Sequence, residues 1–309
     1  MGDRVIPVPL HPTPEGLERL VARKLAAGLT VSVCLPARDE APTIAQIVRS
    51  IGVLVRAGLV DEIVVCDDGS TDDTAALAAA AGARVIEPGS IDGHRGTGKG
   101  EALWTSLVAS TGDLVCWVDA DIRDFDVSFI TRLLEPLIDD TADFVKGYYV
   151  RPFGDAPTGG GRVTELVARP LLSLLLPDLA GIVQPLSGEY AGRREVLEAV
   201  PFVQGWGVDI ALLVDVARLV GADRVAQADL GIRRHKHRPL DELAPQAMAV
   251  LMAVLDRTGS ADVPMEATLR RHADDHSPVE VPVSLAARPP ASLVRRGIEP
   301  LRPPEPLVG

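Results

Sequence analysis

The sequence predicts an α/β protein built on a parallel sheet with helices on both faces. Short apolar runs of strand length alternate with helix-like segments along residues 30–125. Strands joined in this way by helical crossovers pair in parallel and bury both faces of their sheet. Apolar residues make up 47% of the 309 positions and charged residues 24%, ordinary values for a globular protein that leave enough apolar material for a sizeable core.

The first half of the chain supplies the clearest elements. The expected strands are Val31–Leu35, Glu62–Cys66, Arg84–Glu87 and Leu114–Val118. The expected helices are Glu15–Ala27, Thr43–Val55, Thr71–Ala81 and Glu101–Ser110. The second of these helices carries its apolar residues at Ile44, Ile47, Val48 and Ile51, which is the spacing of one helix face.

The second half is less regular. We expect a strand at Phe144–Val150, a Gly-rich turn at Thr158–Arg162, and helices at Val163–Leu176, Val208–Leu219 and Asp241–Asp256. Pro170 should kink or break the first of these helices, because proline lacks the N–H that a helix interior needs. Arg288–Gly309 carries six prolines and is expected to be an extended tail.

Composition excludes two classes of protein. The formal net charge of −12 argues against a nucleic-acid binder, which usually shows a basic footprint. The longest apolar stretch, Leu171–Leu186, is interrupted by Pro177, Asp178 and Gln184, and it is shorter than the ~20 residues that span a bilayer. We therefore expect neither a nucleic-acid partner nor a membrane partner.

Three cysteines, Cys34, Cys66 and Cys116, lie in apolar surroundings without a CxxC pair. Buried, reduced thiols are the expected state. The odd number of cysteines and the lack of a recognisable signal peptide favour a cytoplasmic location.

Polar clusters follow three of the expected strands directly: Pro36–Glu40, Asp67–Ser70 and Asp119–Asp121. Ligands of open α/β sheets bind beyond the carboxyl ends of the strands, so these clusters should line one crevice. Asp119 and Asp121 could hold Mg²⁺ together with phosphate oxygens, although a solvated turn would also explain them. A plain strand–turn–helix connection explains Gly69 and Ser70, but it leaves the adjacent carboxylates of Asp67 and Asp68 without a reason.

Three further segments combine glycine or histidine with cations. Gly96–Gly100 lets backbone approach a phosphate beside Lys99, although its spacing is not that of a Walker A loop. Gly159–Thr164 leads into a helix and could bind an anion with Arg162. Arg233–Arg238 carries four cations and two histidines, of which His235 could join Asp121 in a metal site. A flexible loop, a helix-entry turn and a solvated basic loop are the respective alternatives.

In this order, strand–PARDE, strand–DDGSTDD and strand–DAD resemble the nucleotide-sugar half of GT-A glycosyltransferases over residues 30–125. Later stretches are similar to actinobacterial glucosyl-3-phosphoglycerate synthases, and this similarity extends over residues 30–256. These stretches are Gly98–Trp104, Gly159–Leu172, Pro185–Ala191 and Arg238–Leu243.

The resemblance implies a GT-A fold, in which a Rossmann-like nucleotide-binding sheet is merged with a smaller acceptor-binding subdomain. It divides the chain into an N-terminal extension (1–29), a nucleotide-sugar-binding half (30–125), an acceptor-binding half (126–260) and a C-terminal tail (261–309).

The resemblance also implies an activity. Members of that family transfer glucose from a nucleoside-diphosphate glucose, here most simply UDP-glucose, to 3-phosphoglycerate with retention of anomeric configuration. They require Mg²⁺, for which Mn²⁺ or Co²⁺ can substitute, and they feed glucosylglycerate and methylglucose lipopolysaccharide pathways. A homodimer is expected on the same ground.

Site residues follow from the matching motifs. The nucleotide-sugar set is Pro36, Ala37, Arg38, Glu40, Asp68, Lys99, Asp119, Ala120 and Arg233. The donor-sugar set is Leu186, Trp206 and Asp209, and the residues expected to act in catalysis are Asp209, Leu186 and Lys99. The metal ligands would be Asp121 and His235, and the acceptor set is Gly161, Arg162, Thr164 and His237.

Four positions depart from the family pattern. Asp39 stands where asparagine is common, Trp206 and Asp209 stand where tyrosine and glutamate are common, and His237 replaces an asparagine. These changes leave the donor sugar and the acceptor open.

Three alternatives therefore remain. They are a mannosyl-3-phosphoglycerate synthase using GDP-mannose, a polyprenyl-phosphate glycosyltransferase, and a non-catalytic sugar-nucleotide sensor. The lack of an anchor argues against the second, and the presence of Asp121, His235 and Asp209 argues against the third.

Overall fold

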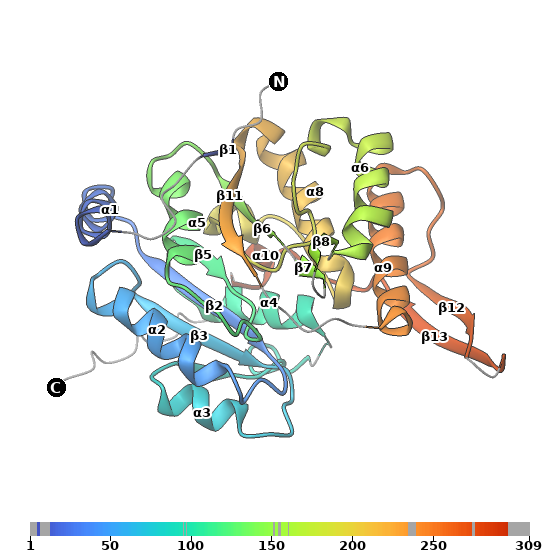
Figure 1. Cartoon of the computed structure of the whole chain (residues 1–309), viewed down its shortest axis with the longest axis horizontal. Coiled ribbons are helices and arrows are strands. Elements are labelled where there is room, and N and C mark those ends of the chain that lie inside the picture. Colours follow the sequence, from blue (N-terminus) through green and yellow to red (C-terminus); the bar gives the residue numbers. More distant parts are fainter. Residues whose placement is uncertain are drawn as a thin grey trace.

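The computed structural model describes residues 5–6, 13–94, 96, 98–150, 152–153, 156–159, 161–233, 239–273 and 276–295. Its centre is an eight-stranded sheet in the order β1-β11-β6-β9-β5-β2-β3-β4 (Figure 1). In this order the strands are Val5–Ile6, Val225–Ile232, Phe144–Val150, Tyr190–Arg193, Leu114–Trp117, Val31–Ala37, Glu62–Asp67 and Arg84–Ile86.

The strands and helices predicted for the first half are confirmed, with ends that differ by a few residues. The helices are α1 (Pro14–Ala26), α2 (Ile44–Arg56), α3 (Thr74–Ala80) and α4 (Lys99–Ala109). α1 packs against α5 (Ser128–Ile138), a helix that the sequence analysis missed. Strands from both predicted halves of the chain belong to the one sheet.

The expectation of an all-parallel sheet is wrong at β9, which runs antiparallel to both β5 and β6. β9 has four residues, Tyr-Ala-Gly-Arg, which is too short to stand out as an apolar run. Its pairing sets Tyr190 opposite Trp117, so the residues that precede β9 lie beside the carboxyl end of β5. This reversal brings the loop before Tyr190 to the same edge of the sheet as Asp119.

Each face of the sheet buries its own apolar core. Within β2, Val33 and Leu35 point into one core with α2 and α5, whereas Cys34 points into the other with α4 and α8. β5 alternates in the same way, since Trp117 and Cys116 lie on opposite faces. All three cysteines are fully buried and form no disulfide, as expected, and burial raises the pKa of the Cys34 thiol to about 12.

The second half adds short elements around a few longer helices. A π-helical turn (Thr164–Ala168) passes directly into α6 (Arg169–Leu175), with Pro170 in the first turn of α6. The predicted interruption is therefore a change of helix type just before Pro170, and Pro170 lies in the first turn of α6, where a missing N–H is tolerated. The two remaining long helices are α8 (Val208–Val220) and α9 (Leu240–Thr258), both as predicted.

Shorter elements complete the description. The strands are β7 (Pro152–Phe153), β8 (Ala156–Gly159) and β10 (Phe202–Val203). β8 covers the start of the expected Thr158–Arg162 turn. α7 spans Arg194–Glu198, and 3₁₀ turns lie at Pro177–Leu179, Gly205–Gly207 and Ala222–Arg224. No helix of the described part of the chain is long and apolar enough to cross a membrane.

Residues beyond 260 differ from the expected tail. β12 (Glu266–His272) and β13 (Pro278–Ser284) form a hairpin that extends from the body of the protein (Figure 1). β14 (Ala287–Arg288) then pairs with β10, and α10 (Ala291–Arg295) follows. The expectation of an extended chain from Arg288 is wrong as far as residue 295, because Arg288 is buried and Trp104 Nε1 donates to the Pro289 carbonyl at 2.8 Å. Residues 296–309 lie outside the described part.

Gly100 and Gly52 offer a matched test of how closely α4 packs. A methyl group on Gly100 would overlap the carbonyl of Val203 in β10, whereas one on Gly52 of α2 would meet only Arg56 Nη1, at 3.5 Å. We expect Gly100→Ala to lower the free energy of unfolding by about 1–3 kcal/mol, the usual cost of overpacking. Gly52→Ala should leave it unchanged or raise it by up to about 1 kcal/mol. Urea denaturation measures both values, and equal stabilities would contradict the close approach of α4 and β10.

Candidate functional site

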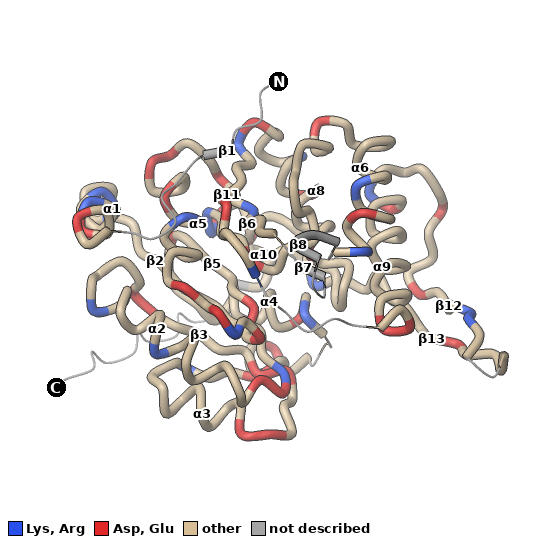
Figure 2. The backbone as a smooth tube through the Cα atoms, viewed as in Figure 1, with Lys and Arg blue, Asp and Glu red and all other residues tan. Residues whose placement is uncertain are grey.

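A cavity of about 410 Å³ opens at the carboxyl ends of β2, β3 and β5. The three polar clusters that were predicted to share one crevice all contribute to its wall. The lining residues are Pro36, Ala37, Arg38, Glu40, Asp68, Gly98, Lys99, Ala102, Asp119, Ala120, Asp121, Gly205 and Trp206. Acidic residues gather in the loops that follow β3 and β5, as Figure 2 shows.

The adjacent carboxylates after β3 have separate roles. Asp67 is buried, and its Oδ1 accepts hydrogen bonds from the Ser70 backbone N–H at 3.0 Å and from the Ser70 hydroxyl at 2.5 Å. Asp68 lines the cavity instead, where its Oδ2 accepts from the Gly98 N–H at 3.2 Å. Asp67 thus shapes the turn, and Asp68 connects it to the Gly-rich loop before α4.

Asp39 joins the loops that follow β2 and β3. Its φ of 55° lies in the left-handed region, which asparagine and aspartate tolerate better than most residues. Its N–H donates to the Ser70 hydroxyl at 2.9 Å, and its Oδ1 accepts from the Thr71 N–H at 2.7 Å. An asparagine side chain presents the same acceptor oxygen, so this departure from the family pattern preserves the local geometry.

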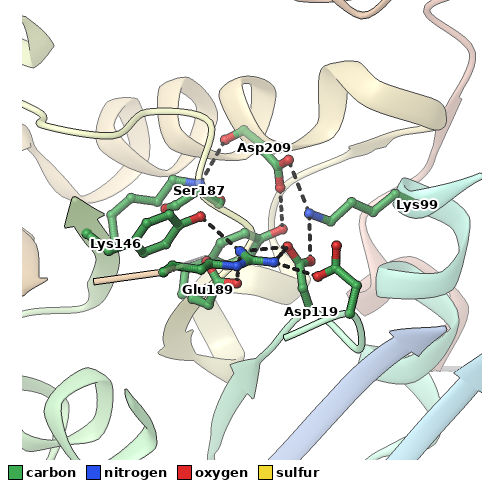
Figure 3. A network of polar contacts seen from close by, with 10 residues as sticks. Lys99, Asp119, Lys146, Ser187, Glu189 and Asp209 are labelled. Atoms are coloured by element: carbon green, nitrogen blue, oxygen red, sulfur yellow. Dashed lines mark hydrogen bonds and ion pairs between the residues drawn. The ribbon is translucent and has the colours of Figure 1, made fainter. Parts of the chain in front are cut away.

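A network of charged side chains joins residues of the cavity wall to residues behind it (Figure 3). Lys99 Nζ, at the start of α4, lies 3.1 Å from Asp119 Oδ1 and 3.3 Å from Asp209 Oδ2. Arg233, directly after β11, lies 3.2 Å from Asp119 Oδ2 and 2.6 Å from Asp121 Oδ1, and it also pairs with Glu189. Asp119 is therefore held between two cations that lie 134 residues apart in the sequence.

Electrostatics keeps these groups charged. Burial alone would lower the pKa of Lys99, but Asp119 and Asp209 more than offset it and raise that pKa. Burial alone would raise the pKa of Asp119, but Lys99 and Arg233 more than offset it and lower that pKa. Lys99 and Arg233 therefore present fixed positive charge in a site of low dielectric, where charge interactions are strong.

Asp209 is held from two sides at the start of α8. It is 6% exposed, and its Oδ1 accepts a hydrogen bond from the Tyr190 hydroxyl at 3.2 Å. Lys99 Nζ donates to its Oδ2 at 3.3 Å. Burial and the Asp209 carboxylate raise the pKa of Tyr190 well above its ordinary value, so the hydroxyl keeps its proton and remains a donor.

Lys146 of β6 holds the backbone at Ser187 and Asp209. Its Nζ donates to the carbonyl of Ser187 at 2.8 Å and to that of Asp209 at 3.4 Å, and it lies 4.2 Å from the centroid of the Tyr190 ring. The side chain is almost fully buried, and burial lowers its pKa to about 8 despite the nearby Asp209 carboxylate.

Gly188 allows the loop before β9 to approach Asp119. A methyl group at this position would overlap the Asp119 carboxylate. The following residue, Glu189, is completely buried and pairs with Arg233. The antiparallel course of β9 thus supplies both the close approach and a second carboxylate for the Arg233 guanidinium.

The structure brings many of the predicted site residues together. Of the nucleotide-sugar set, eight residues line the cavity, and Arg233 lies behind them against Asp119 and Asp121. Trp206 also lines the cavity. Asp209 does not line it but forms an ion pair with Lys99, which does. Leu186 packs against the apolar core on the α8 face.

The described members of the acceptor set do not line this cavity. Gly161, Arg162 and Thr164 lie at the entry to the π-helical turn and are absent from the cavity lining. His235 and His237 fall outside the described residues, so the predictions for them stay predictions.

The sequence analysis missed Tyr149, Glu189, Tyr190 and Lys146, all of which belong to the network around Arg233 and Asp209. One signal for them was present. Lys146 stands in the middle of an otherwise apolar strand, Phe144–Val150, and a lysine at such a position is seldom buried without partners.

The carboxylates of the cavity suit a hard divalent cation whose remaining coordination positions are filled by the substrate. No group of three or more His, Cys, Asp or Glu side chains among the described residues could hold a metal alone. Mg²⁺, however, is often bound by one or two carboxylates plus phosphate oxygens and water. Asp121 has a side chain that is 43% exposed, and a carboxylate with one guanidinium contact retains further acceptor positions.

Comparisons with known proteins decide the family. The glycosyl transferase family 2 profile matches residues 32–200. Glucosyl-3-phosphoglycerate synthase of Mycolicibacterium smegmatis is 48% identical over 277 residues, which cover 87% of this chain and 91% of that protein. The chain belongs to the glucosyl-3-phosphoglycerate synthase family, within glycosyl transferase family 2. It is therefore an enzyme of the hexosyltransferase class.

Solved structures of the family agree with this assignment. One is glucosyl-3-phosphoglycerate synthase from Mycobacterium tuberculosis in complex with Mg²⁺ and UDP, with a TM-score of 0.83 and 43% identity over 92% of this chain and 98% of that one. Another holds Mn²⁺, UDP-glucose and phosphoglyceric acid, with a TM-score of 0.83 and 44% identity over 95% and 99% of the two chains. The GT-A-type fold predicted for this family member is thereby confirmed.

Lys146 should make stability depend on pH. Its pKa is about 8 in the fold and 10.5 ordinarily, so between these values the unfolded chain binds a proton that the folded chain does not. The free energy of unfolding therefore rises with pH across this window, on the order of 1–3 kcal/mol from this group.

The variant Lys146→Met lacks that increment. We expect the difference in unfolding free energy between the unaltered chain and the variant to grow in favour of the unaltered chain from pH 7 to pH 10. Denaturant titrations at several pH values measure it, and the variant's own curve provides the background. Two parallel pH curves would show that Lys146 titrates normally.

Proposed function

We propose that this enzyme transfers glucose from UDP-glucose to 3-phosphoglycerate with retention of configuration and with the help of a divalent metal ion. The observation that carries the proposal is the cavity in which Asp119 and Asp121 meet Lys99 and Arg233 at the carboxyl ends of the strands. Relatives of known structure that bind UDP-glucose and phosphoglyceric acid support the choice of both substrates.

In this proposal the cavity holds the nucleotide along β2 and β3. Arg38, Glu40 and Asp68 offer polar groups near the mouths of these strands, and Ala37 and Ala120 leave room for a base and a ribose. Lys99 supplies a cation for the diphosphate, and Trp206 provides an apolar wall for the sugar.

Asp121, with His235 as the predicted second ligand, would hold the metal, and Asp119 would lie beside it. When bound, such an ion neutralises the charge that develops on the departing diphosphate. Lys99 and Arg233 add preorganised positive charge at the same place, which costs no reorganisation during the reaction. Lys99 thus stabilises the leaving group, and its pairing with Asp209 keeps it aimed at the cavity.

The arrangement supports transfer without a covalent glycosyl-enzyme. Glu189 is fully buried against Arg233, and Asp209 is engaged by both Lys99 and Tyr190. A carboxylate held by such partners is a poor nucleophile. We propose instead that the acceptor hydroxyl attacks from the same face as the leaving phosphate, which accepts its proton. A glycosyl adduct trapped on Asp209 or Glu189 would contradict this step.

The acceptor is proposed to be held by its phosphate at Gly161, Arg162 and Thr164, with Leu186 and Asp209 near the donor sugar. Guanidinium groups recognise phosphate through two parallel hydrogen bonds, which fixes orientation as well as affinity. Homodimer formation, a cytoplasmic location and a role in glucosylglycerate or methylglucose lipopolysaccharide synthesis rest on the resemblance and stay predictions.

A donor–acceptor matrix tests the proposed function. UDP-glucose, GDP-glucose and GDP-mannose are each combined with 3-phosphoglycerate or glycerate, and released nucleoside diphosphate is measured. We expect turnover with UDP-glucose and 3-phosphoglycerate, loss of turnover after chelation, and recovery with Mg²⁺. The proton NMR coupling of the product reports the anomeric configuration. Preference for GDP-mannose would favour the mannosyl alternative, and equal turnover of glycerate would contradict the phosphate handle.

Arg162→Ala tests the acceptor assignment. Loss of one charged hydrogen-bonded contact is worth about 1.5–3 kcal/mol, so the KM for 3-phosphoglycerate should rise roughly 10- to 100-fold. The KM for the donor should change little. Arg270→Ala, on the exposed face of the β12–β13 hairpin, is the control and should change neither constant. Equal rises in the KM for the donor and the KM for the acceptor would contradict a specific role of Arg162 in acceptor binding.

A further inference from the structure

Arg288 lies far along the chain from every predicted site residue and is 4% exposed. Its guanidinium carbon lies 3.8 Å from the centroid of the Trp104 ring in α4. It pairs with Asp92 in the turn after β4, and its Nε lies 3.5 Å from Glu101 Oε2 in the first turn of α4. One side chain therefore contacts residues on both sides of the Gly-rich loop.

The Glu101 carboxylate is the inner partner of this contact. Glu101 is completely buried, two residues after Lys99, and it also accepts a hydrogen bond from Gln204 Nε2 at 3.2 Å. Gly96 of the Gly-rich loop packs so closely on this pair that a methyl group there would overlap both Glu101 and Gln204. The loop backbone thus rests directly on the polar contacts that Arg288 completes.

The backbone around Arg288 contacts the second loop of the cavity. β14 pairs with β10 so that Arg288 lies opposite Phe202, and the Gln204 N–H donates to the Ala286 carbonyl at 2.7 Å. Gly205 and Trp206, which line the cavity, follow at once. The two loops meet where a Cβ on Gly98 would lie 3.1 Å from the Gly205 Cα.

From these contacts we infer that Arg288 is a positioning residue for the donor site. It holds the start of α4, with Lys99, against the turn that carries Trp206 and leads into α8 with Asp209, and it does so without touching the substrate. The inference deepens the proposed function, on which its kinetic consequence rests. Its structural part concerns the order of two loops and does not depend on the identity of either substrate.

Geometry explains why this support matters. Lys99 must lie between Asp119 and Asp209 at 3.1 and 3.3 Å, and the Gly98 N–H must reach Asp68. Displacements of about 1 Å at a catalytic centre can cost up to roughly 100-fold in rate. Loosening either end of the loop would therefore weaken donor use first, whereas the proposed acceptor residues lie on another element.

The test separates positioning from simple stability. Arg288→Met leaves the buried Glu101 without its cation, which can destabilise the fold. The double variant Arg288→Met/Glu101→Gln removes that charge as well and should restore the melting temperature. For the double variant we expect kcat/KM for UDP-glucose to fall by about 10- to 100-fold, with the KM for 3-phosphoglycerate unchanged. Hydrogen exchange at residues 98–104 and 202–207, measured without ligand, should be faster.

Arg257→Met is the matched control. The Arg257 side chain is similarly buried and pairs with Asp215 at 2.7 Å between α9 and α8, and neither residue lines the cavity. It should lower the melting temperature but leave donor kinetics and exchange at both loops unchanged. Normal donor kinetics and normal exchange in the Arg288 double variant would overturn the inference, as would equal effects of Arg257→Met.

The two proposals fail in different ways. If the unaltered chain transfers no glucose to 3-phosphoglycerate, the proposed function is wrong, and the exchange measurement still decides whether Arg288 orders the two loops. If transfer is normal but exchange is insensitive to Arg288, the positioning role is wrong and the function stands.

Discussion

The pairing of Asp119 with Lys99 and Arg233 is the interaction on which the cavity depends. The Asp119 side chain is only 25% exposed, so its charge carries a desolvation cost, which is offset because a cation lies within 3.2 Å of each of its oxygens. The two cations begin α4 and follow β11, so the pair also fixes the relation of these elements. Among the described residues of the network, Asp119, Asp121, Glu189 and Asp209 face Lys99, Arg233 and Lys146, which leaves one negative charge in excess.

That balance suits a ligand that arrives with its own cation. A divalent ion bound to a diphosphate is close to neutral, and it would meet a site that is close to neutral as well. The whole-chain charge of −12 is therefore a poor guide to the site, because it sums acidic residues on helices and loops throughout the chain, whereas the site depends on a few cations in fixed positions. An acidic chain can therefore bind phosphorylated small molecules when a few cations are held in fixed positions at the binding site.

Much of this architecture could be predicted from sequence, and the failures have physical reasons. β2, β3 and β5 are buried on both faces and therefore appear as continuous apolar runs, and the polar residues after them had to share one edge of the sheet. β9 could not be recognised in the sequence, because its four residues include a glycine and show no hydrophobic alternation, and because its pairing depends on strands distant in the chain. Arg288 was assigned to a tail because prolines follow it, although its burial against Trp104 is set by tertiary contacts.

The contacts that build the cavity join residues very far apart along the chain. Asp119 meets Gly188 and Arg233, and Glu101 meets Arg288. During synthesis the strands β2 to β5 emerge early, and Gly188, Arg233 and Arg288 are made only after all four of them. Long-range contacts of this kind form slowly, because closing a long loop costs conformational entropy before the new contacts stabilise the fold. The sheet can therefore begin to assemble early, whereas the pocket itself is completed only when nearly all of the described chain has left the ribosome.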